Sequence, residues 1–129
     1  MTYLFNDGGR VAAGFPAEGG DCVARAVAVA SGRAYREVHK ALSDTVANKG
    51  DADKGVPTSD DWQRWMAENG FSECGVYEGF SYVGFSYDDP RFQKGRYVLV
   101  AQLNLGGQVT GHAVAMVDGV VHDAQDHTK

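Results

Sequence analysis

The spacing of apolar residues predicts two helices in the first part of the chain. The apolar stretch Cys22–Ala30 follows Asp21, whose short carboxylate side chain is typical of a helix N-cap, and it stops just before Gly32. Glycine often closes a helix because it adopts a left-handed backbone conformation without strain. A second helix is predicted over Tyr35–Ala47, where apolar residues recur every three or four positions.

A third helix is predicted after a polar loop at 49–58. Ser59 or Asp60 would cap its start, and it would end near Gly70. Its large apolar residues fall on one face at helical spacing: Trp62, Trp65 and Met66. We therefore expect the third helix to pack through this face.

Beyond Gly70 the pattern changes to that of strands. The segment Arg96–Leu103 is continuously apolar and predicts a largely buried strand, and Gly111–Val117 alternates between small or polar and apolar residues. Asp118-Gly119 is a strong signal for a two-residue hairpin turn, after which Val120–Asp123 forms the return strand. Helices followed by an antiparallel sheet indicate an α+β fold rather than alternating β-α-β units.

Composition limits the classes of partner. The 129 residues fit one domain, residues 1–129, with enough apolar side chains (43%) for a core. The net charge is −5, with 12 basic and 17 acidic residues, whereas nucleic-acid binders usually carry a basic face. The most apolar stretch is interrupted by Arg25 and is too short to span a bilayer. We expect neither a nucleic-acid nor a membrane partner, and the absence of a secretory signal favours a cytoplasmic location.

The two cysteines, Cys22 and Cys74, are expected to be reduced thiols in such a compartment. Cys22 lies in the first turn of a predicted helix, where backbone N–H groups and the helix dipole stabilise a thiolate and can face an oxyanion. Glycines before Cys22 would let a substrate approach the backbone. The alternative is that Cys22 is a small buried residue at a helix start. Cys74 has no nearby base in the sequence, and we expect it to be inert.

The C-terminal hairpin places a histidine next to an aspartate. With Asp118-Gly119 as the turn, Val114 faces Asp123, so His112 and Asp123 are diagonal neighbours on one face. A carboxylate within reach of an imidazole fixes its tautomer and stabilises its protonated form. The alternative is a structural histidine beside an incidental aspartate.

Two further features are open to more than one interpretation. The C-terminal residues His122, Asp123, Asp126 and His127 are metal-ligand types, but adjacent strand residues point to opposite faces, so we expect no metal or other cofactor. The aromatic segment 77–87 lies within a glycine-rich region that predicts an irregular strand or a binding loop over 76–85. It would line a substrate groove, form a protein-binding surface, or cover the outside of the sheet.

The order Cys, His, Asp, with the cysteine opening a helix and the other two on a hairpin, resembles a family of small bacterial and phage proteins. That family has a papain-like cysteine-peptidase fold. The similar segments are NDGGR at 6–10, GDCVARAVAVASGRAYREVHKAL at 20–42 and GHAVAMVDGVVHDAQD at 111–126. The resemblance implies that Cys22 is the nucleophile, His112 the general base and acid, and Asp123 the residue that orients the imidazole.

The chain departs from the papain-like pattern at the oxyanion hole. Papain-like enzymes usually have a glutamine a few residues before the cysteine, and residues 15–21 contain none. Asn6 is the best substitute because its amide can donate a hydrogen bond, and Gln102 and Gln108 are weaker substitutes.

Two functions fit these observations. The first is thiol-dependent acyl transfer, as in a cysteine peptidase, amidase or deamidase acting on a peptide or protein substrate. The second is a non-catalytic protein-binding module on a degenerate peptidase scaffold, such as a phage protein that binds a host factor. In either case we expect the protein to be located in the cytoplasm of a bacterium or of a phage-infected host.

Overall fold

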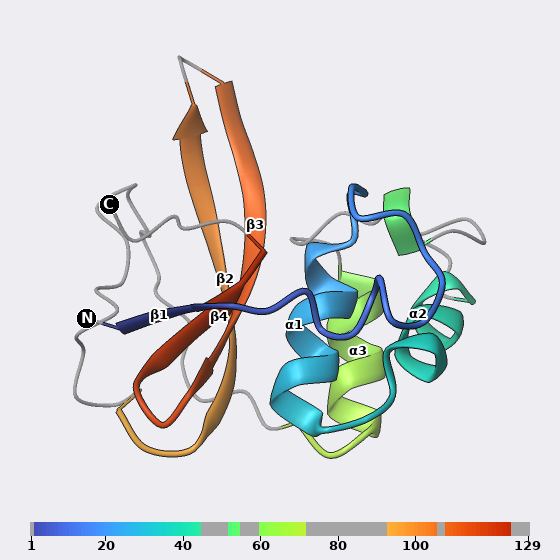
Figure 1. Ribbon diagram of the computed structural model, residues 1–129, viewed down its shortest axis with the longest axis horizontal. Helices are drawn as coiled ribbons and strands as arrows, with labels where there is room; N and C mark the ends of the chain where they lie inside the picture. The colour runs from blue at the N-terminus through green and yellow to red at the C-terminus, as the bar shows by residue number, and fades with distance from the viewer. Residues whose placement is uncertain (1, 45–51, 55–59, 72–92, 106–107, 125–129) are drawn as a thin grey trace.

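A helical layer lies against one face of a four-stranded sheet in the computed structural model of the chain (Figure 1). The structure describes residues 2–44, 52–54, 60–71, 93–105 and 108–124. Within these ranges the helices are α1 (Cys22–Ser31), α2 (Tyr35–Ser43), the 3-10 turn η2 (Ala52–Lys54) and α3 (Asp60–Glu68). The strands are β1 (Thr2–Phe5), β2 (Arg96–Leu105), β3 (Gln108–Val117) and β4 (Val120–Asp123). The predicted α+β class is confirmed.

The sheet is mixed rather than wholly antiparallel as predicted. Its strand order is β1-β4-β3-β2, and β2, β3 and β4 pair antiparallel as expected. Strand β1 was not predicted, and it pairs parallel with β4 at the edge. Because β1 is short and its partner lies at the opposite end of the sequence, no hairpin turn marks the pairing. The N-terminal strand therefore lies directly beside the predicted site strand β4.

Helix α1 packs closely against β3 because both surfaces consist of small side chains. Ala26 and Val27 of α1 are almost fully buried, and they belong to the same core cluster as Ala113 and Ala115 of β3. The opposite face of the sheet has its own small core, formed by Leu99, Val114, Met116 and Val121 with Tyr3 and Tyr97 packed against it. The sheet is thus buried on both faces around β3.

The predicted helix ends are partly correct. Gly32 closes α1 with a φ of 72°, and its N–H group bonds to Ala28, as the sequence predicts. Helix α2 ends at Ser43, before the predicted Ala47. The Ser43 hydroxyl accepts a hydrogen bond from the Ala52 N–H (2.8 Å), which ties the start of η2 to the end of α2.

Helix α3 packs through Met66, which is buried, and through Trp65, which lies against the same core. The Phe71 N–H group bonds back to Met66, and Gly70 has a φ of 93°, so the helix closes near the predicted glycine. The side chain of Trp62, Cys74 and the aromatic segment 77–87 lie outside the described residues.

The hairpin between β3 and β4 has the predicted turn. Asp118 and Gly119 have φ angles of 49° and 82°, the positive pair that a type I′ turn requires. Val117 pairs with Val120, as predicted, and this register extends through Met116 and Val121. The register of the site residues on these strands was therefore predictable. None of the helices in the described ranges has the length and apolar character needed to cross a lipid bilayer.

Candidate active site

Cys22 is the first residue of α1 and carries a free, half-buried thiol. It packs against the core cluster that joins α1 to β3. The first hydrogen bond along the helix runs from the Arg25 N–H to the Asp21 carbonyl (3.1 Å). The amides of Cys22, Val23 and Ala24 precede this bond, so they belong to the group that a helix cannot satisfy internally.

Asp21 holds the N-cap position but does not cap the helix with its side chain. Its carboxylate instead forms ion pairs with Arg10 (2.9 Å) and Arg25 (2.7 Å) and accepts a hydrogen bond from the Tyr35 hydroxyl. The sequence predicted the position of this residue correctly and its contacts wrongly. As a result, the amides in the first turn of α1 are not covered by the carboxylate directly before them.

His112 and Asp123 form the predicted pair across the hairpin. The His112 Nε2 atom lies 2.7 Å from the Asp123 Oδ2 atom, and the side chains are only 18% and 7% exposed. Burial alone lowers the pKa of His112, but the hydrogen bonds and charges of Asp123 and Cys22 outweigh it and raise that pKa to about 9. His112 is therefore in contact with both other residues of the predicted triad and is protonated at neutral pH.

The backbone of Asp123 is held in place by the unpredicted strand β1 and by the residue directly after it. The Asp123 carbonyl accepts hydrogen bonds from the Asn6 N–H (2.9 Å) and from the Tyr3 hydroxyl (3.0 Å). The second carboxylate oxygen of Asp123 accepts a bond from the Ala124 N–H (2.7 Å). Both the backbone and the carboxylate of this residue are thus fixed while it faces His112.

Asn6 does not occupy the position expected of an oxyanion donor. Its amide nitrogen donates to His122 Nδ1 (3.1 Å), and its amide oxygen accepts from the Gly8 N–H (2.8 Å). His122 precedes Asp123 on β4, so it points to the opposite face of the sheet. Burial and the charge of Arg96 lower the pKa of His122, which suits a ring nitrogen that accepts this bond. Asn6, directly after β1, therefore uses its amide to link the end of that strand to β4 rather than to face the site.

The remaining predicted ligands and donors fall where the structure describes no side chain. Gln102 lies on β2 and Gln108 on β3, and their side chains are outside the described residues, as are Asp126 and His127. Across the ranges that the structure describes, no three histidine, cysteine, aspartate or glutamate residues gather in a group that would hold a metal ion.

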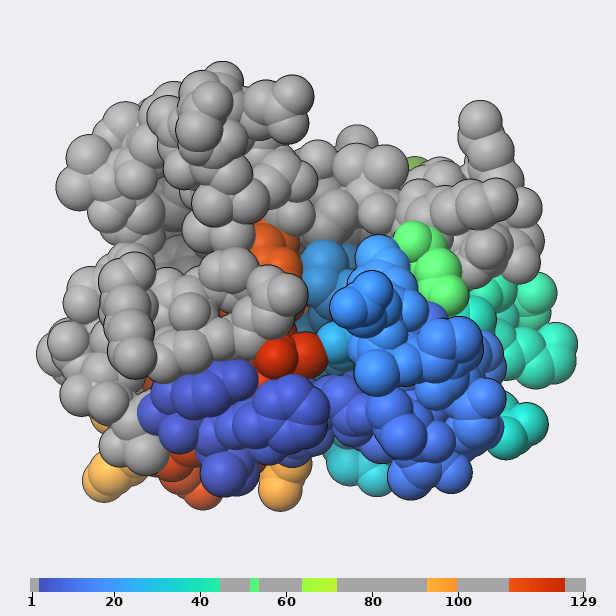
Figure 2. All heavy atoms as spheres, turned by 45° about the horizontal axis from the view of Figure 1, so that its top comes forward, coloured from blue at the N-terminus to red at the C-terminus, as the bar shows by residue number. Residues whose placement is uncertain are grey.

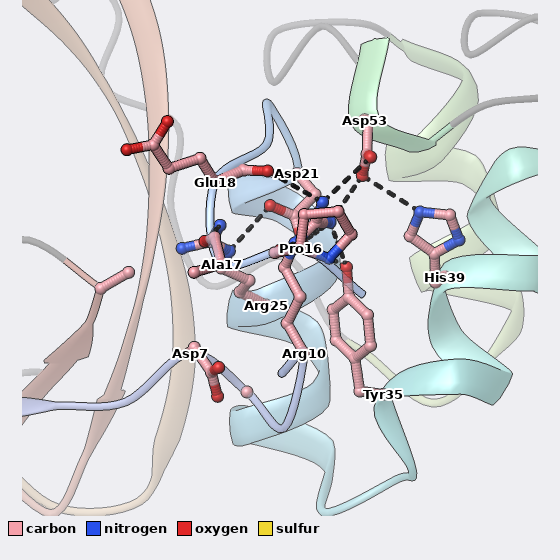
Figure 3. Close-up of polar contacts among 12 residues, drawn as sticks. Asp7, Arg10, Pro16, Ala17, Glu18, Asp21, Arg25, Tyr35, His39 and Asp53 are labelled. Carbon is pink, nitrogen blue, oxygen red and sulfur yellow. Dashed lines mark hydrogen bonds and ion pairs between the residues drawn. The ribbon is translucent and has the colours of Figure 1, made fainter. Parts of the chain in front are cut away.

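Next to the site lies a polar group, centred on the buried Arg10 and Asp21, that the sequence did not predict; it also contains Tyr35, His39 and the partly exposed Asp53 (Figure 3). We call it the Arg10 cluster. Arg10 is 1% exposed, and its guanidinium donates to the Tyr35 hydroxyl (2.8 Å) and pairs with Asp53 (2.7 Å). Asp53 also contacts His39 Nε2 (3.1 Å). The cluster joins the loop before α1, helix α2 and η2 around one guanidinium.

The charges of the Arg10 cluster stabilise one another. The hydrogen bond from Arg10 lowers the pKa of Asp53 below its usual range, against the opposing effect of burial. Burial, the hydrogen bond to Asp21 and the charge of that carboxylate raise the pKa of Tyr35, so its hydroxyl stays protonated. Within the cluster, Asp53 is therefore ionised and Tyr35 neutral at neutral pH.

Gly19 and Gly20 are required by this packing. A Cβ atom on Gly19 would overlap the Arg10 guanidinium, and one on Gly20 would lie 2.5 Å from the Asp53 carbonyl oxygen. The sequence suggested that these glycines open the backbone to a substrate, whereas the structure gives them a packing role. The segment NDGGR at 6–10 and Asp21 can be recognised in the sequence. No local sequence pattern, however, indicates that Arg10 pairs with a residue as distant as Asp53.

Comparisons of the chain with protein-family models, with curated proteins and with solved structures found no match.

Proposed function

We propose that this protein is a thiol-dependent acyl-transfer enzyme with a papain-like arrangement of Cys22, His112 and Asp123. The observation that carries the proposal is the position of His112, whose imidazole interacts with both the Asp123 carboxylate and the Cys22 thiol. A nucleophile, a base and a third group that orients the base are the requirements for covalent catalysis by cysteine.

In the first step, the Cys22 sulfur attacks the carbonyl carbon of an amide. The proton needed later is already on His112, because its pKa of about 9 keeps the imidazole protonated at neutral pH. An imidazolium beside the sulfur favours the thiolate, which is the nucleophilic form. The carbonyl electron pair moves to oxygen, and a tetrahedral oxyanion forms.

In the second step, the carbon–nitrogen bond breaks while His112 donates its proton to the leaving amine. Cys22 now carries the acyl group as a thioester, and His112 is neutral. A water molecule then attacks the thioester, His112 takes one of its protons, and the acid is released as the thiolate is restored. Asp123 stabilises the imidazolium at the start and the end of this cycle.

The first turn of α1 supplies donors for the oxyanion. The N–H group of Cys22 itself belongs to this turn, and the Asp21 carboxylate does not cover it. Asp21 is instead paired with Arg10 and Arg25, which reduces its repulsion of a negative charge on the sulfur or on the oxyanion. Backbone amides aimed at a developing oxyanion are a large source of catalysis in acyl transfer.

Peptidase, amidase and deamidase reactions share these steps, so the proposal extends to a peptide or protein substrate with an amide as the reacting group. It is tested by the pH dependence of iodoacetamide alkylation, measured separately at each cysteine of the folded protein. We expect Cys22 to react rapidly at pH 6–7, well below the pKa of an ordinary cysteine, about 8.5. The substitution His112→Ala should reduce this rate at pH 6–7 by at least about tenfold.

Cys74 is the reference thiol in the same chain, and unfolding curves of the His112→Ala variant show whether it is folded. A Cys22 rate no higher than that of Cys74 between pH 6 and 9 would contradict the proposal and favour the protein-binding module. A fast rate that His112→Ala leaves unchanged would also contradict it, because the imidazole would then have no part in activating the sulfur.

A further inference from the structure

The end of strand β1 lies beside the acid of the proposed triad. Strand β1 pairs parallel with β4, with Tyr3 opposite Val121 and Phe5 opposite Asp123. Paired residues on neighbouring strands point to the same face of a sheet. Tyr3 and Val121 illustrate this, since they pack together in the small core on that face. The side chains of Phe5 and Asp123 therefore lie on one face.

Phe5 is nevertheless not part of the core. Its side chain is 66% exposed, whereas Asp123 next to it is 7% exposed. Tyr3, two residues earlier on the same face, packs against the core and donates a hydrogen bond to the Asp123 carbonyl. Figure 2 shows β1 (dark blue) at the surface beside the red atoms of β4. An aromatic ring open to solvent thus adjoins the buried carboxylate that contacts His112.

We propose that Phe5 determines specificity by contacting an apolar side chain of the substrate next to the reacting amide. This inference rests on the proposed function, since it places the substrate at Cys22. A substrate held at Cys22 and His112 must extend over the neighbouring surface, and β1 borders that surface through its pairing with Asp123. Burial of an exposed ring against an apolar group is favourable, whereas a charged group there would lose hydration without gaining a partner. The preferred substrate class is a peptide with an aromatic or large aliphatic residue at this position.

The test compares two reagents that react with Cys22 and differ in one group. Iodoacetamide is small, and N-benzyl iodoacetamide adds an aromatic ring to the same reactive carbon. We measure the Cys22 alkylation rate with each reagent in the full chain and take the ratio of the benzyl rate to the small-reagent rate. The substitution Phe5→Ser should lower this ratio by roughly fivefold to tenfold, and Phe5→Leu should lower it less.

Leu4→Ser is the matched control. Leu4 is 52% exposed on the same strand, but it pairs with His122 and so points to the opposite face. The control should leave the ratio unchanged, and both substituted residues are exposed, so both variants should fold. An unchanged ratio in Phe5→Ser, or an equal fall in Leu4→Ser, would overturn the specificity role.

Failure of this inference is distinguishable from failure of the proposed function. If iodoacetamide labels Cys22 quickly at pH 6–7 and the ratio does not depend on Phe5, only the specificity role is wrong. If iodoacetamide labels Cys22 no faster than Cys74, the proposed function is wrong, and the specificity role falls with it.

Discussion

Two adjacent residues at the start of α1 lead into two different polar groups. Asp21 belongs to the Arg10 cluster, where the arginine and aspartate side chains are 1% and 0% exposed. Cys22 belongs to the proposed triad, where the His112 side chain is 18% exposed and the thiol is half-buried. In the Arg10 cluster the guanidinium faces two carboxylates and a hydroxyl. In the proposed triad, an imidazole with a raised pKa lies beside the Cys22 thiol.

Under the proposed function, the first group has a structural role and the second a chemical one. Buried charges that are fully paired fix the chain but have no capacity left for a substrate. A thiol that reaches the surface while its neighbouring base is held by a buried carboxylate combines access with orientation. Because Asp21 and Cys22 are consecutive, the Arg10 cluster anchors the backbone directly before the Cys22 thiol.

The strongest test of this comparison removes the centre of the Arg10 cluster. The substitution Arg10→Met keeps much of the side-chain volume but leaves Asp53 without its guanidinium and Asp21 with only Arg25. Breaking a buried ion pair on one side typically costs about 3–5 kcal/mol. We expect the free energy of unfolding in urea to fall by about that amount at pH 7.

Arg25→Met is the control for this prediction. Arg25 also pairs with Asp21, but its side chain is 12% exposed and the Arg10 pair remains after its loss. Its cost should be clearly smaller. Equal losses of stability in the two variants would show that Arg10 contributes no more to folding than Arg25, the other cation paired with Asp21.

The parts of the fold that were predictable are those fixed by local sequence. The turn Asp118-Gly119 accepts positive φ angles at both positions, and this sets the register that joins His112 to Asp123. Gly32 closes α1 for the same kind of local reason. The Cys22–His112 contact was predicted through the family resemblance rather than from spacing, because the two residues lie on separate elements.

The parts that were not predictable depend on contacts between distant segments. Strand β1 has no turn linking it to β4, so its parallel pairing is invisible in the sequence. Asn6 looked like a free donor because its partner His122 is also on that distant strand. Asp21 was predicted to cap the helix with its carboxylate, but that carboxylate contacts Arg10 and Tyr35 instead. In each case the residue contacts a distant segment instead of making the interaction that its neighbouring sequence predicts.

In the proposed triad, the raised pKa of His112 predicts that the free energy of unfolding depends on pH. His112 has a raised pKa of about 9 in the folded chain, compared with about 6.5 in the unfolded chain. The folded state therefore holds the proton more tightly, and the stabilisation is complete below pH 6.5. This stabilisation is lost as the pH rises through 9. The free energy of unfolding should therefore fall by up to about 3 kcal/mol between pH 6 and pH 9.5. Urea unfolding at pH 6 and pH 9.5 measures it.

His112→Asn is the reference for this measurement, because asparagine can still bond to Asp123 but does not titrate. The fall in stability between pH 6 and pH 9.5 should be smaller in this variant than in the native chain by the contribution of His112. Parallel curves for the two proteins would exclude a linked proton on His112 and, with it, the imidazolium on which the proposed mechanism depends.

The smallest expected effect comes from Tyr35→Phe, which removes one hydroxyl from the Arg10 cluster. The direct Arg10–Asp21 pair (2.9 Å) remains, so no charge becomes unpaired. Each of the two bonds made by the hydroxyl is worth about 1 kcal/mol, and we expect a total loss of stability of about 1–2 kcal/mol in urea unfolding. Iodoacetamide should still label Cys22 at the native rate, because Asp21 keeps both arginines. A large fall in that rate without a matching loss of stability would show that the Arg10 cluster tunes the sulfur directly, and the division between a structural and a chemical group would no longer hold.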